Sequence, residues 1–290
     1  MAKNGLTISM IFQAQSANYG EGVGNIAQLK KMSRTNGEVY TYISRQAIRY
    51  NIVQQMGIDN TPVSLDKSEG KNVAQFSPET TIIDYPEIDL FGYMKTKKQQ
   101  NASVRSAVVR LSNAISLEPY KSDMDFLNNM GLANRSNLPN ALASSEIHNS
   151  LYAYTITIDL DKVGIDTNGD IEISNEEKAN RINSLLDTVQ FLYRDIRGRR
   201  ENMNPIFIIG GVYERKNPYF EDRLKISKKD LNVDILKSIV DSCNDTKENT
   251  LVGYINGYFN NDEQIKETLN AQTVSEVFNK LKEEVVQYYA

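Results

Sequence analysis

The sequence predicts an α+β protein, and three observations support this prediction. Residues 6–14 and 150–160 alternate apolar and polar side chains, which is typical of half-buried strands. Residues 175–197 repeat apolar side chains at three- and four-residue steps, as an amphipathic helix does. A chain of 290 residues is also long enough to bury a substantial core and to carry sizeable insertions.

In the N-terminal part, Leu6, Ile8, Met10 and Phe12 share one face of the first expected strand. A Gly-rich loop over 16–25, SANYGEGVGN, follows the strand, and a helix is expected over about 42–56. Residues 57–105 are polar and lack periodicity, so they are interpreted as an insertion outside the core. A second strand is predicted over 106–117.

In the C-terminal part, a polar loop precedes the third strand, in which Tyr152, Tyr154 and Ile156 alternate with smaller residues. Ser174 and Glu177 have the capping-box spacing at the start of the helix over 175–197. The apolar run IFIIGGVY, after Pro205, predicts a buried central strand. The order strand, helix, strand, strand, helix, strand is the ferredoxin-like order of RRM domains, here with two insertions. The last 75 residues are expected to add strands and helices, such as TLVGYINGYF and VSEVFNKLKEEVVQYY.

Composition excludes several classes of protein. Cys243 and His148 are the only cysteine and histidine, so the chain can form neither an internal disulfide nor a zinc site of three or four N/S ligands. No apolar run approaches eighteen residues, and the N-terminus lacks the pattern of a secretory leader. The expectation is a soluble, cytoplasmic protein.

The net charge of −4 conceals a strong segregation of charge. Residues 1–60 carry +3, residues 91–115 carry +5 and residues 191–200 carry +3, which leaves −15 on the rest of the chain. Clustered Lys and Arg side chains neutralise phosphates regardless of the net charge. A nucleic-acid partner is therefore compatible with the acidic total, although a basic cluster can also be a solvated face without a ligand.

Other motifs have simpler explanations than a functional site. Residues 166–177 match part of an EF-hand calcium loop, but Ile171 occupies the position that requires Gly, and a strand precedes the loop where a helix is needed. A turn followed by a capped helix explains the same residues. Gly20, Gly22 and Gly24 do not give the dinucleotide fingerprint, and His148 has no nucleophile in a recognisable setting.

Two separated segments resemble one family of CRISPR-associated proteins. The first is LTISMIFQAQSANYGEGVGNIAQLKKMSRTNGEVYTYISRQAIRYNIV, with SANYGE, the basic K-K-x-x-R segment and YISRQAIRY. The second is IDLFGYMKTKKQQNASVRSAVVRLSNAISLEPY, with a D-x-F-G motif before a core strand. They are similar to the DevR-like subgroup of the Cas seven family, the backbone subunits of type I-B Cascade complexes in the RAMP superfamily. The likeness covers most of the chain and is weaker beyond residue 215.

The resemblance implies a modified RRM palm with inserted finger and thumb elements. The palm would comprise residues 1–56, 106–118 and 150–290, the finger-type insertion 57–105 and the thumb-type insertion 119–149. Several copies would form a filament along the spacer of a CRISPR RNA, next to other Cascade subunits, and the RNA would recognise target DNA by base pairing. The implied RNA-binding residues are Ser16, Asn18, Tyr19, Asn25, Lys30, Lys31, Arg34, Ser44, Arg45, Gln46, Arg49, Lys95, Lys97, Lys98 and Arg105.

The resemblance also implies that the chain is not an enzyme. Related subunits that cut RNA use an acidic residue in the loop after the first strand, whereas here the first acid is Glu21. Because a carboxylate is needed there to bind a metal or assist in-line attack, no catalytic residue, metal or cofactor is expected. The alternative is a metal-dependent RAMP-type ribonuclease that uses Glu21, or Asp159 with Asp161.

Overall fold

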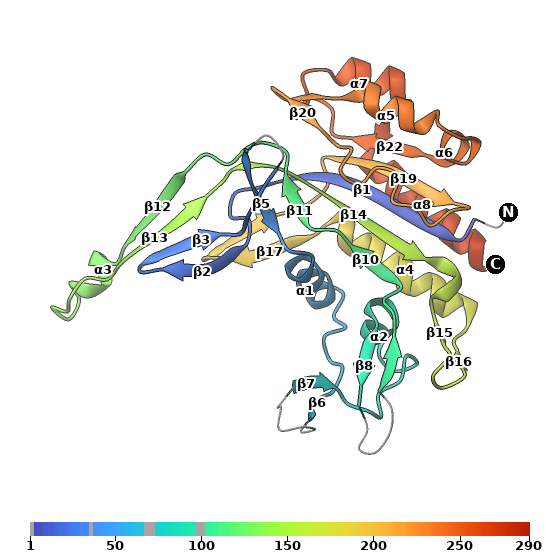
Figure 1. The fold of residues 1–290 in the computed structure, drawn as a ribbon, viewed down its shortest axis with the longest axis horizontal. Coiled ribbons are helices and arrows are strands. Elements are labelled where there is room, and N and C mark those ends of the chain that lie inside the picture. The colour runs from blue at the N-terminus through green and yellow to red at the C-terminus, as the bar shows by residue number, and fades with distance from the viewer. Residues whose placement is uncertain (1–2, 35–36, 67–72, 97–101) are drawn as a thin grey trace.

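The computed structural model describes residues 3–34, 37–66, 73–96 and 102–290, and this part of the chain contains one sheet of nine strands (Figure 1). Along the sheet, the strands follow the order β23 (Gln272–Thr273), β22 (Leu251–Tyr254), β19 (Phe207–Tyr213), β1 (Gly5–Ala14), β14 (Ser150–Asp159), β11 (Ala114–Ser116), β5 (Val39–Ile43) and β4 (Lys31–Ser33). Strand β10 (Val109–Leu111) also pairs with β14. The α+β prediction is confirmed.

The strands expected from sequence lie at the centre of this sheet. Strand β1 pairs antiparallel with β14 over its whole length, from Gly5 opposite Asp159 to Ala14 opposite Ser150, and with β19 on its other side. Strand β11 follows on the outer side of β14, also antiparallel. In the resulting order β19-β1-β14-β11, the first expected strand, β1, lies between the last, β19, and the third, β14.

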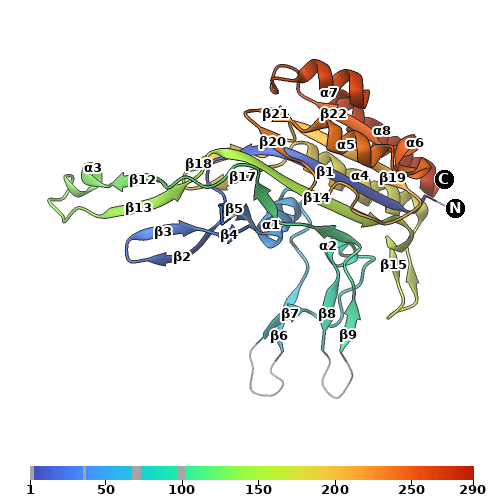
Figure 2. The same ribbon diagram turned by 45° about the horizontal axis from the view of Figure 1, so that its top comes forward.

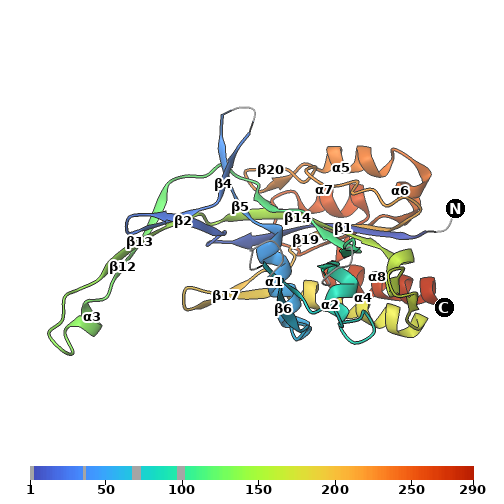
Figure 3. The same cartoon turned by 60° about the horizontal axis from the view of Figure 1, so that its bottom comes forward.

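Helices cover both faces of the sheet, as Figure 3 shows with α5 and α7 on one side and α4 and α8 on the other. Leu6, Ile8, Met10 and Phe12 of β1 point into a core shared with α1, α4 and α8. Ile11 points the opposite way, into a second core beneath α5 and α7. Because both faces are covered, nearly all of β1 is buried. The helices that pack on the sheet are α1 (Arg45–Gln55), α4 (Asn175–Gln190), α5 (Val233–Val240), α6 (Asn244–Asn249), α7 (Asp262–Leu269) and α8 (Val274–Tyr289).

Two N-terminal expectations need correction. The Gly-rich segment is a hairpin of β2 (Tyr19–Val23) and β3 (Ile26–Leu29), which Gly24 turns with a positive φ of 58°. The helix expected from residue 42 begins at Arg45, because residues 39–43 pair with β4 and β11 as a strand. Ser44 separates the two elements: its Oγ accepts a hydrogen bond from the backbone N–H of Ala47 and caps α1.

Two later elements also differ from expectation. The strand predicted over 106–117 is divided into β10 and β11 by a bulge, because Leu111 and Ile115 are four residues apart while their partners on β14, Ile156 and Ala153, are three apart. The helix predicted to continue to residue 197 ends at Gln190. Residues beyond it form the hairpin of β17 (Tyr193–Ile196) and β18 (Arg199–Asn202). Their backbone groups pair across the hairpin and do not continue the helix, although the apolar residues keep the helical spacing.

The two expected insertions protrude from the sheet in different directions (Figure 2). Residues 57–105 contain more regular structure than expected: β6 (Val63–Asp66) with β7 (Val73–Phe76), α2 (Pro86–Phe91), and β8 (Tyr93–Lys95) with β9 (Ser103–Arg105). The other protrusion is a long hairpin of β12 (Asp123–Asn128) and β13 (Leu142–Ile147) with α3 (Met130–Ala133) at its end. Strand β13 also pairs with β3, giving the order β12-β13-β3-β2. Shorter elements are the 3-10 helix Leu160–Lys162 and the hairpins β15 (Ile165–Asp166) with β16 (Ile171–Glu172) and β20 (Ile226–Ser227) with β21 (Asp230–Leu231).

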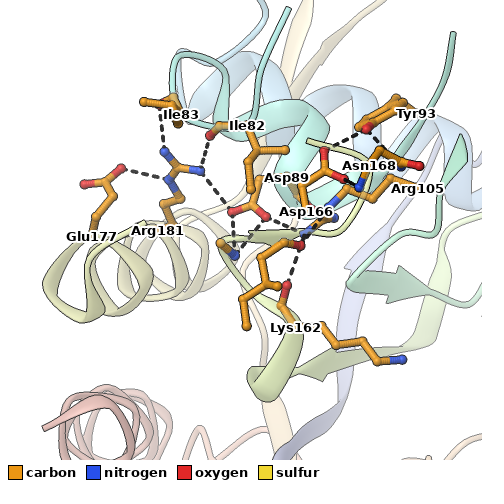
Figure 4. A network of polar contacts seen from close by, with 12 residues as sticks. Ile82, Ile83, Asp89, Tyr93, Arg105, Lys162, Asp166, Asn168, Glu177 and Arg181 are labelled. Carbon is orange, nitrogen blue, oxygen red and sulfur yellow. Dashed lines mark hydrogen bonds and ion pairs between the residues drawn. The ribbon is translucent and has the colours of Figure 1, made fainter. Parts of the chain in front are cut away.

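A buried carboxylate fixes the base of residues 57–105 to the rest of the molecule (Figure 4). Asp89, in α2, is fully buried and accepts hydrogen bonds from Arg105 Nη2 at 2.7 Å and Arg181 Nη1 at 3.0 Å. The backbone N–H of Gly164 donates to the same carboxylate at 2.9 Å. Burial raises the pKa of Asp89, against the opposing charges of the two arginines. Asp89 therefore joins α2, β9, α4 and the loop after the 3-10 helix.

Candidate nucleic-acid interface

Two of the predicted arginine contacts lie on α1. Arg45 and Gln46 are exposed and Arg49 is half-buried, one turn further along the helix. The first turn contains no acidic residue, so the positive end of the helix dipole adds to the arginine charges. The backbone N–H of Arg45 donates to Asn113 Oδ1 at 2.9 Å, which fixes this end of α1 against the β10–β11 bulge.

A groove of about 400 Å³ runs between α1 and β10. Its lining combines cations with apolar atoms: Arg45, Gln46, Arg49, Phe91, Ala107, Val109, Arg110 and Leu111. The guanidinium of Arg49 lies 4.9 Å from the centre of the Phe91 ring and 3.8 Å from Glu87, and burial lowers its pKa, opposed by Glu87. A second hollow, of about 410 Å³, shares Arg45, Arg110 and Leu111 with the groove and continues past Asn113. Three arginines therefore border one path across this surface.

The predicted contacts in the first loop are mainly internal to the protein. Asn18 Oδ1 accepts hydrogen bonds from the backbone N–H and the hydroxyl of Ser44, at 3.2 and 2.8 Å. Tyr19 donates its hydroxyl hydrogen to the carbonyl of Glu146 at 3.0 Å. Ser16 and Ser44 are buried, whereas Asn25 is exposed at the turn of the β2–β3 hairpin. The loop thus positions α1 beside the end of β1, and only Asn25 of these residues is exposed.

The basic segment after this hairpin is partly paired. Lys31 Nζ lies 2.6 Å from Glu146 Oε1 and 4.6 Å from the centre of the Tyr120 ring. Arg34 is exposed, and its guanidinium stacks over the Tyr40 ring at 4.5 Å. Lys30 is half-buried, and its backbone N–H donates to the Asn18 carbonyl at 2.6 Å. These residues lie along β3 to β5, next to the loop that precedes α1.

Two of the predicted contacts, Lys95 and Arg105, are buried in the structure, which argues against their binding RNA. Lys95 is 5% exposed and donates to the Thr80 carbonyl at 2.6 Å. Arg105 is 8% exposed and directs its guanidinium to Asp89 and to the carbonyls of Lys162 and Ile165 (Figure 4). Both side chains are occupied in packing residues 57–105 and are not presented to a ligand. Lys97 and Lys98 lie outside the described residues.

Two residues that the sequence did not single out, Arg110 and Asn113, border the candidate interface. Arg110 lies in the basic segment 91–115, and its exposed side chain borders both hollows and is 3.0 Å from Asp159 Oδ2. Asn113 occupies the bulge and accepts from the Arg45 N–H. The polar residues Arg110, Ser112 and Asn113 within an otherwise apolar strand were the available signal.

The carboxylates considered for metal binding have protein partners. Asp159 Oδ2 lies within 4.0 Å of the charged groups of Arg110, Lys162 and Lys216, and Asp161 pairs with Lys216. Asp166, in the β15–β16 hairpin, accepts a hydrogen bond from the Tyr93 hydroxyl of β8 at 2.7 Å and one from the backbone N–H of Asn168 at 3.0 Å. Within the described ranges, no three His, Cys, Asp or Glu side chains gather as metal ligands do. The side chain of Glu21 lies outside the described part of the chain.

His148 is a buried structural residue next to the interface. Its Nδ1 is 2.7 Å from the Thr41 hydroxyl, which in turn is 2.7 Å from the Tyr152 hydroxyl. Burial lowers the pKa of His148 below its ordinary value of 6.5, although Glu118 and Asp123 oppose this effect. The folded chain therefore favours the neutral imidazole more strongly than the unfolded chain does.

We expect the free energy of unfolding to fall as the pH drops below about 6.5, because the unfolded chain then binds a proton that folded His148 resists. Once the pH passes below the lowered pKa of the folded state, both states are protonated and the loss stops growing. Urea denaturation at about pH 7.5 and about pH 5.5 measures the difference. His148→Gln removes the only histidine, so the variant should lose this component. An unchanged pH dependence in the variant contradicts the assignment.

Comparison with known proteins relates both the fold and the sequence to CRISPR systems. A chain of a solved structure titled "CRISPR RNA-guided surveillance complex, pre-nicking" superimposes with a TM-score of 0.65 at 10% identity, covering 97% of this chain and 100% of that chain. A chain of another, titled "CRISPR RNA-guided surveillance complex", gives a TM-score of 0.60 at 12% identity, covering 98% of each chain. The fold is therefore one found in chains of such complexes.

The sequence identifies the family. The family model described as "CRISPR-associated negative auto-regulator DevR/Csa2" matches residues 6–230, so the chain belongs to the DevR/Csa2 family. The "CRISPR-associated protein Cas7/Cst2/DevR" of Myxococcus xanthus (strain DK1622) is 32% identical over 125 residues. That match spans 38% of this chain and 40% of the relative. In the described part of the chain, no helix is both long and apolar enough to cross a membrane.

Proposed function

We propose that the protein is a non-catalytic backbone subunit of a type I CRISPR Cascade complex and binds the spacer part of a CRISPR RNA in the cytoplasm. The observation that supports this function best is the groove between α1 and β10, where Arg45, Arg49 and Arg110 surround an apolar floor. Cations neutralise phosphates, while apolar atoms accept sugar and base surfaces. In this proposal the protein holds the RNA backbone, and base pairing with the RNA recognises target DNA.

The arrangement of the sheet and its two protrusions supports a division into palm, finger and thumb. The order β19-β1-β14-β11, with α1 and α4 on one face, is that of a ferredoxin-like unit and corresponds to an RRM-like palm. Residues 57–105 would be the finger and residues 119–149, which contain the β12–β13 hairpin, the thumb. In Figures 1 and 2, α1 lies between the β12–β13 hairpin on the left and residues 57–105 below, so the two protrusions can flank an RNA bound at α1.

Two exposed apolar surfaces support assembly of several copies. On the β12–α3–β13 hairpin, Phe126 is 60% and Leu127 63% exposed, and Met130, Leu132 and Leu138 are exposed as well. On residues 57–105, Val63, Leu65, Met94 and Val104 are exposed as well. Because the two surfaces lie on different protrusions, contact of one with the other joins copies head to tail. Repetition of a head-to-tail contact builds a filament.

Sequencing the RNA that co-purifies with the protein from its host tests the proposed function. We expect repeat-spacer RNA of one length class, because a filament of fixed composition protects a fixed length of guide. A second measurement uses the purified protein with synthetic repeat-spacer RNA, for which native mass spectrometry should detect several copies on one RNA. A random mixture of cellular RNA in the first experiment, with no assembly in the second, contradicts the proposal.

We also propose that the protein does not cut RNA. The described carboxylates that could serve a metal-dependent ribonuclease, Asp159 and Asp161, are already paired with cations. Incubation of the purified protein with labelled RNA and Mg²⁺ should therefore leave the RNA intact. Cleavage that EDTA abolishes, and that Glu21→Gln or Asp159→Asn also removes, would instead establish the ribonuclease.

A further inference from the structure

The basic segment 191–200 is largely paired within the protein. Its two strands, β17 and β18, place Arg194 directly opposite Glu201. Both side chains are only 5% exposed, and Arg194 Nε donates to Glu201 Oε2 at 2.7 Å. A buried ion pair is costly to desolvate and persists where further hydrogen bonds satisfy its remaining polar atoms. Here those hydrogen bonds go to a different part of the chain.

The remaining polar atoms of this pair bind the backbone of the loop after β1. Glu201 Oε1 accepts from the N–H groups of Gln15 and Ser16, at 2.7 and 3.2 Å. Arg194 Nη1 donates to the carbonyl of Ala17 at 2.6 Å, and its other terminal nitrogen donates to the carbonyl of Ser16. The ion pair thus binds four backbone groups within three consecutive residues.

The held loop leads directly to the N-terminus of α1. Asn18 follows Ala17, and its Oδ1 accepts from both the N–H and the hydroxyl of Ser44. Ser44 is the residue that caps α1. The sequence of contacts therefore runs from the β17–β18 hairpin, through residues 15–18, to the helix end that carries Arg45. Displacement of the loop would release the cap of α1 from Asn18.

We propose that Arg194 and Glu201 are positioning residues that lock residues 15–18, and with them the N-terminus of α1, in the conformation that binds RNA phosphates. This inference rests on the proposed function and deepens it, because it separates basic residues that bind RNA from a basic residue that arranges the site. Arg194 is too buried to neutralise a phosphate itself. Its effect on affinity comes from pre-organisation, since a loop that is already ordered loses less entropy when RNA binds.

Glu201→Gln tests the lock because it keeps the size of the side chain and removes its charge. In the RNA-free protein, we expect the amides of Gln15 and Ser16 to lose hydrogen-exchange protection while amides in the middle of β1 keep theirs. We expect the affinity for a synthetic spacer-length RNA to fall about tenfold. The slope of log affinity against log salt should stay at its wild-type value, because no phosphate contact is removed.

Asp195→Asn is the matched control, since it removes the exposed ion pair with Arg200 in the same hairpin. This variant should keep both the protection and the RNA affinity of the wild type. If Glu201→Gln unfolds, the double variant Arg194→Gln with Glu201→Gln is measured in its place. It leaves no buried charge unpaired, because Arg199, the other partner of Glu201, is 41% exposed.

Two results overturn the lock. One is protection and affinity in the Glu201 variant equal to those of the Asp195 control. The other is a salt slope that changes by about 0.7, because a change of that size means that the hairpin gains or loses a direct contact with a phosphate. Failure of the wild-type protein to bind RNA contradicts the proposed function instead, while the exchange measurement on the free protein still decides whether the loop is locked.

Discussion

Asp89→Asn is expected to lower the free energy of unfolding by about 3–5 kcal/mol, because it removes the charge that buried Arg105 and Arg181 share and leaves Arg181 with only the half-exposed Glu177. Asp89 is fully buried between Arg105 and Arg181, which are also almost completely buried. The variant keeps the shape of the side chain, so lost charge and not a cavity causes the effect. Urea denaturation followed by circular dichroism measures the change.

The control for this experiment is Asp187→Asn, which breaks an ion pair with Lys282 in which Asp187 is 56% exposed. Solvent screening limits such a pair to about 0–1 kcal/mol, so this variant should be close to the wild type. Similar small losses in both variants would mean that the Asp89 cluster does not hold residues 57–105 against α4. In that case the orientation of the proposed finger would need another cause.

Local periodicity was sufficient to predict the centre of the fold. Strands β1 and β14 alternate apolar residues over about ten positions, and their pairing over the full length gives the sheet its middle. Periodicity failed where tertiary hydrogen bonds decide between two possible structures. Tyr42 and Ile43 fit a helix, but they pair with β11 instead. Tyr193 and Ile196 continue the helical spacing of α4, yet they belong to β17 and pair with β18.

Residue type alone could not separate surface cations from buried ones. Arg45 and Arg105 both lie in basic segments that resemble those of an RNA-binding family, yet Arg45 is exposed and Arg105 binds Asp89. The partner of a buried cation lies far away in sequence: Arg181 is 92 residues from Asp89, and no local pattern links them. That Arg45 and Arg49 share a face of α1 was predictable, because they are one helical turn apart. The roles of Arg105 and Arg194 required the structure.

Arg45→Gln together with Arg49→Gln is expected to weaken RNA binding more than any other change on the surface of α1. Each arginine that neutralises a phosphate of single-stranded RNA contributes about 0.7 to the salt slope, so the double variant should lose about 1.4. At roughly 0.15 M salt, the same loss corresponds to an affinity about tenfold lower. Gln is a good helix former and retains part of the apolar stem, so contact of residue 49 with Phe91 is reduced less than by Ala.

Fluorescence anisotropy of labelled spacer-length RNA over a series of salt concentrations measures both quantities. The matched control is Lys237→Gln with Lys266→Gln, which changes the net charge equally but on α5 and α7, away from α1 (Figure 1). If long-range attraction to the whole protein drove binding, both double variants would lose affinity alike. A loss confined to the α1 variant, together with a lower salt slope, means that these two guanidinium groups contact phosphates. An unchanged slope in that variant excludes α1 from the RNA path, even if the protein still assembles on RNA through another surface.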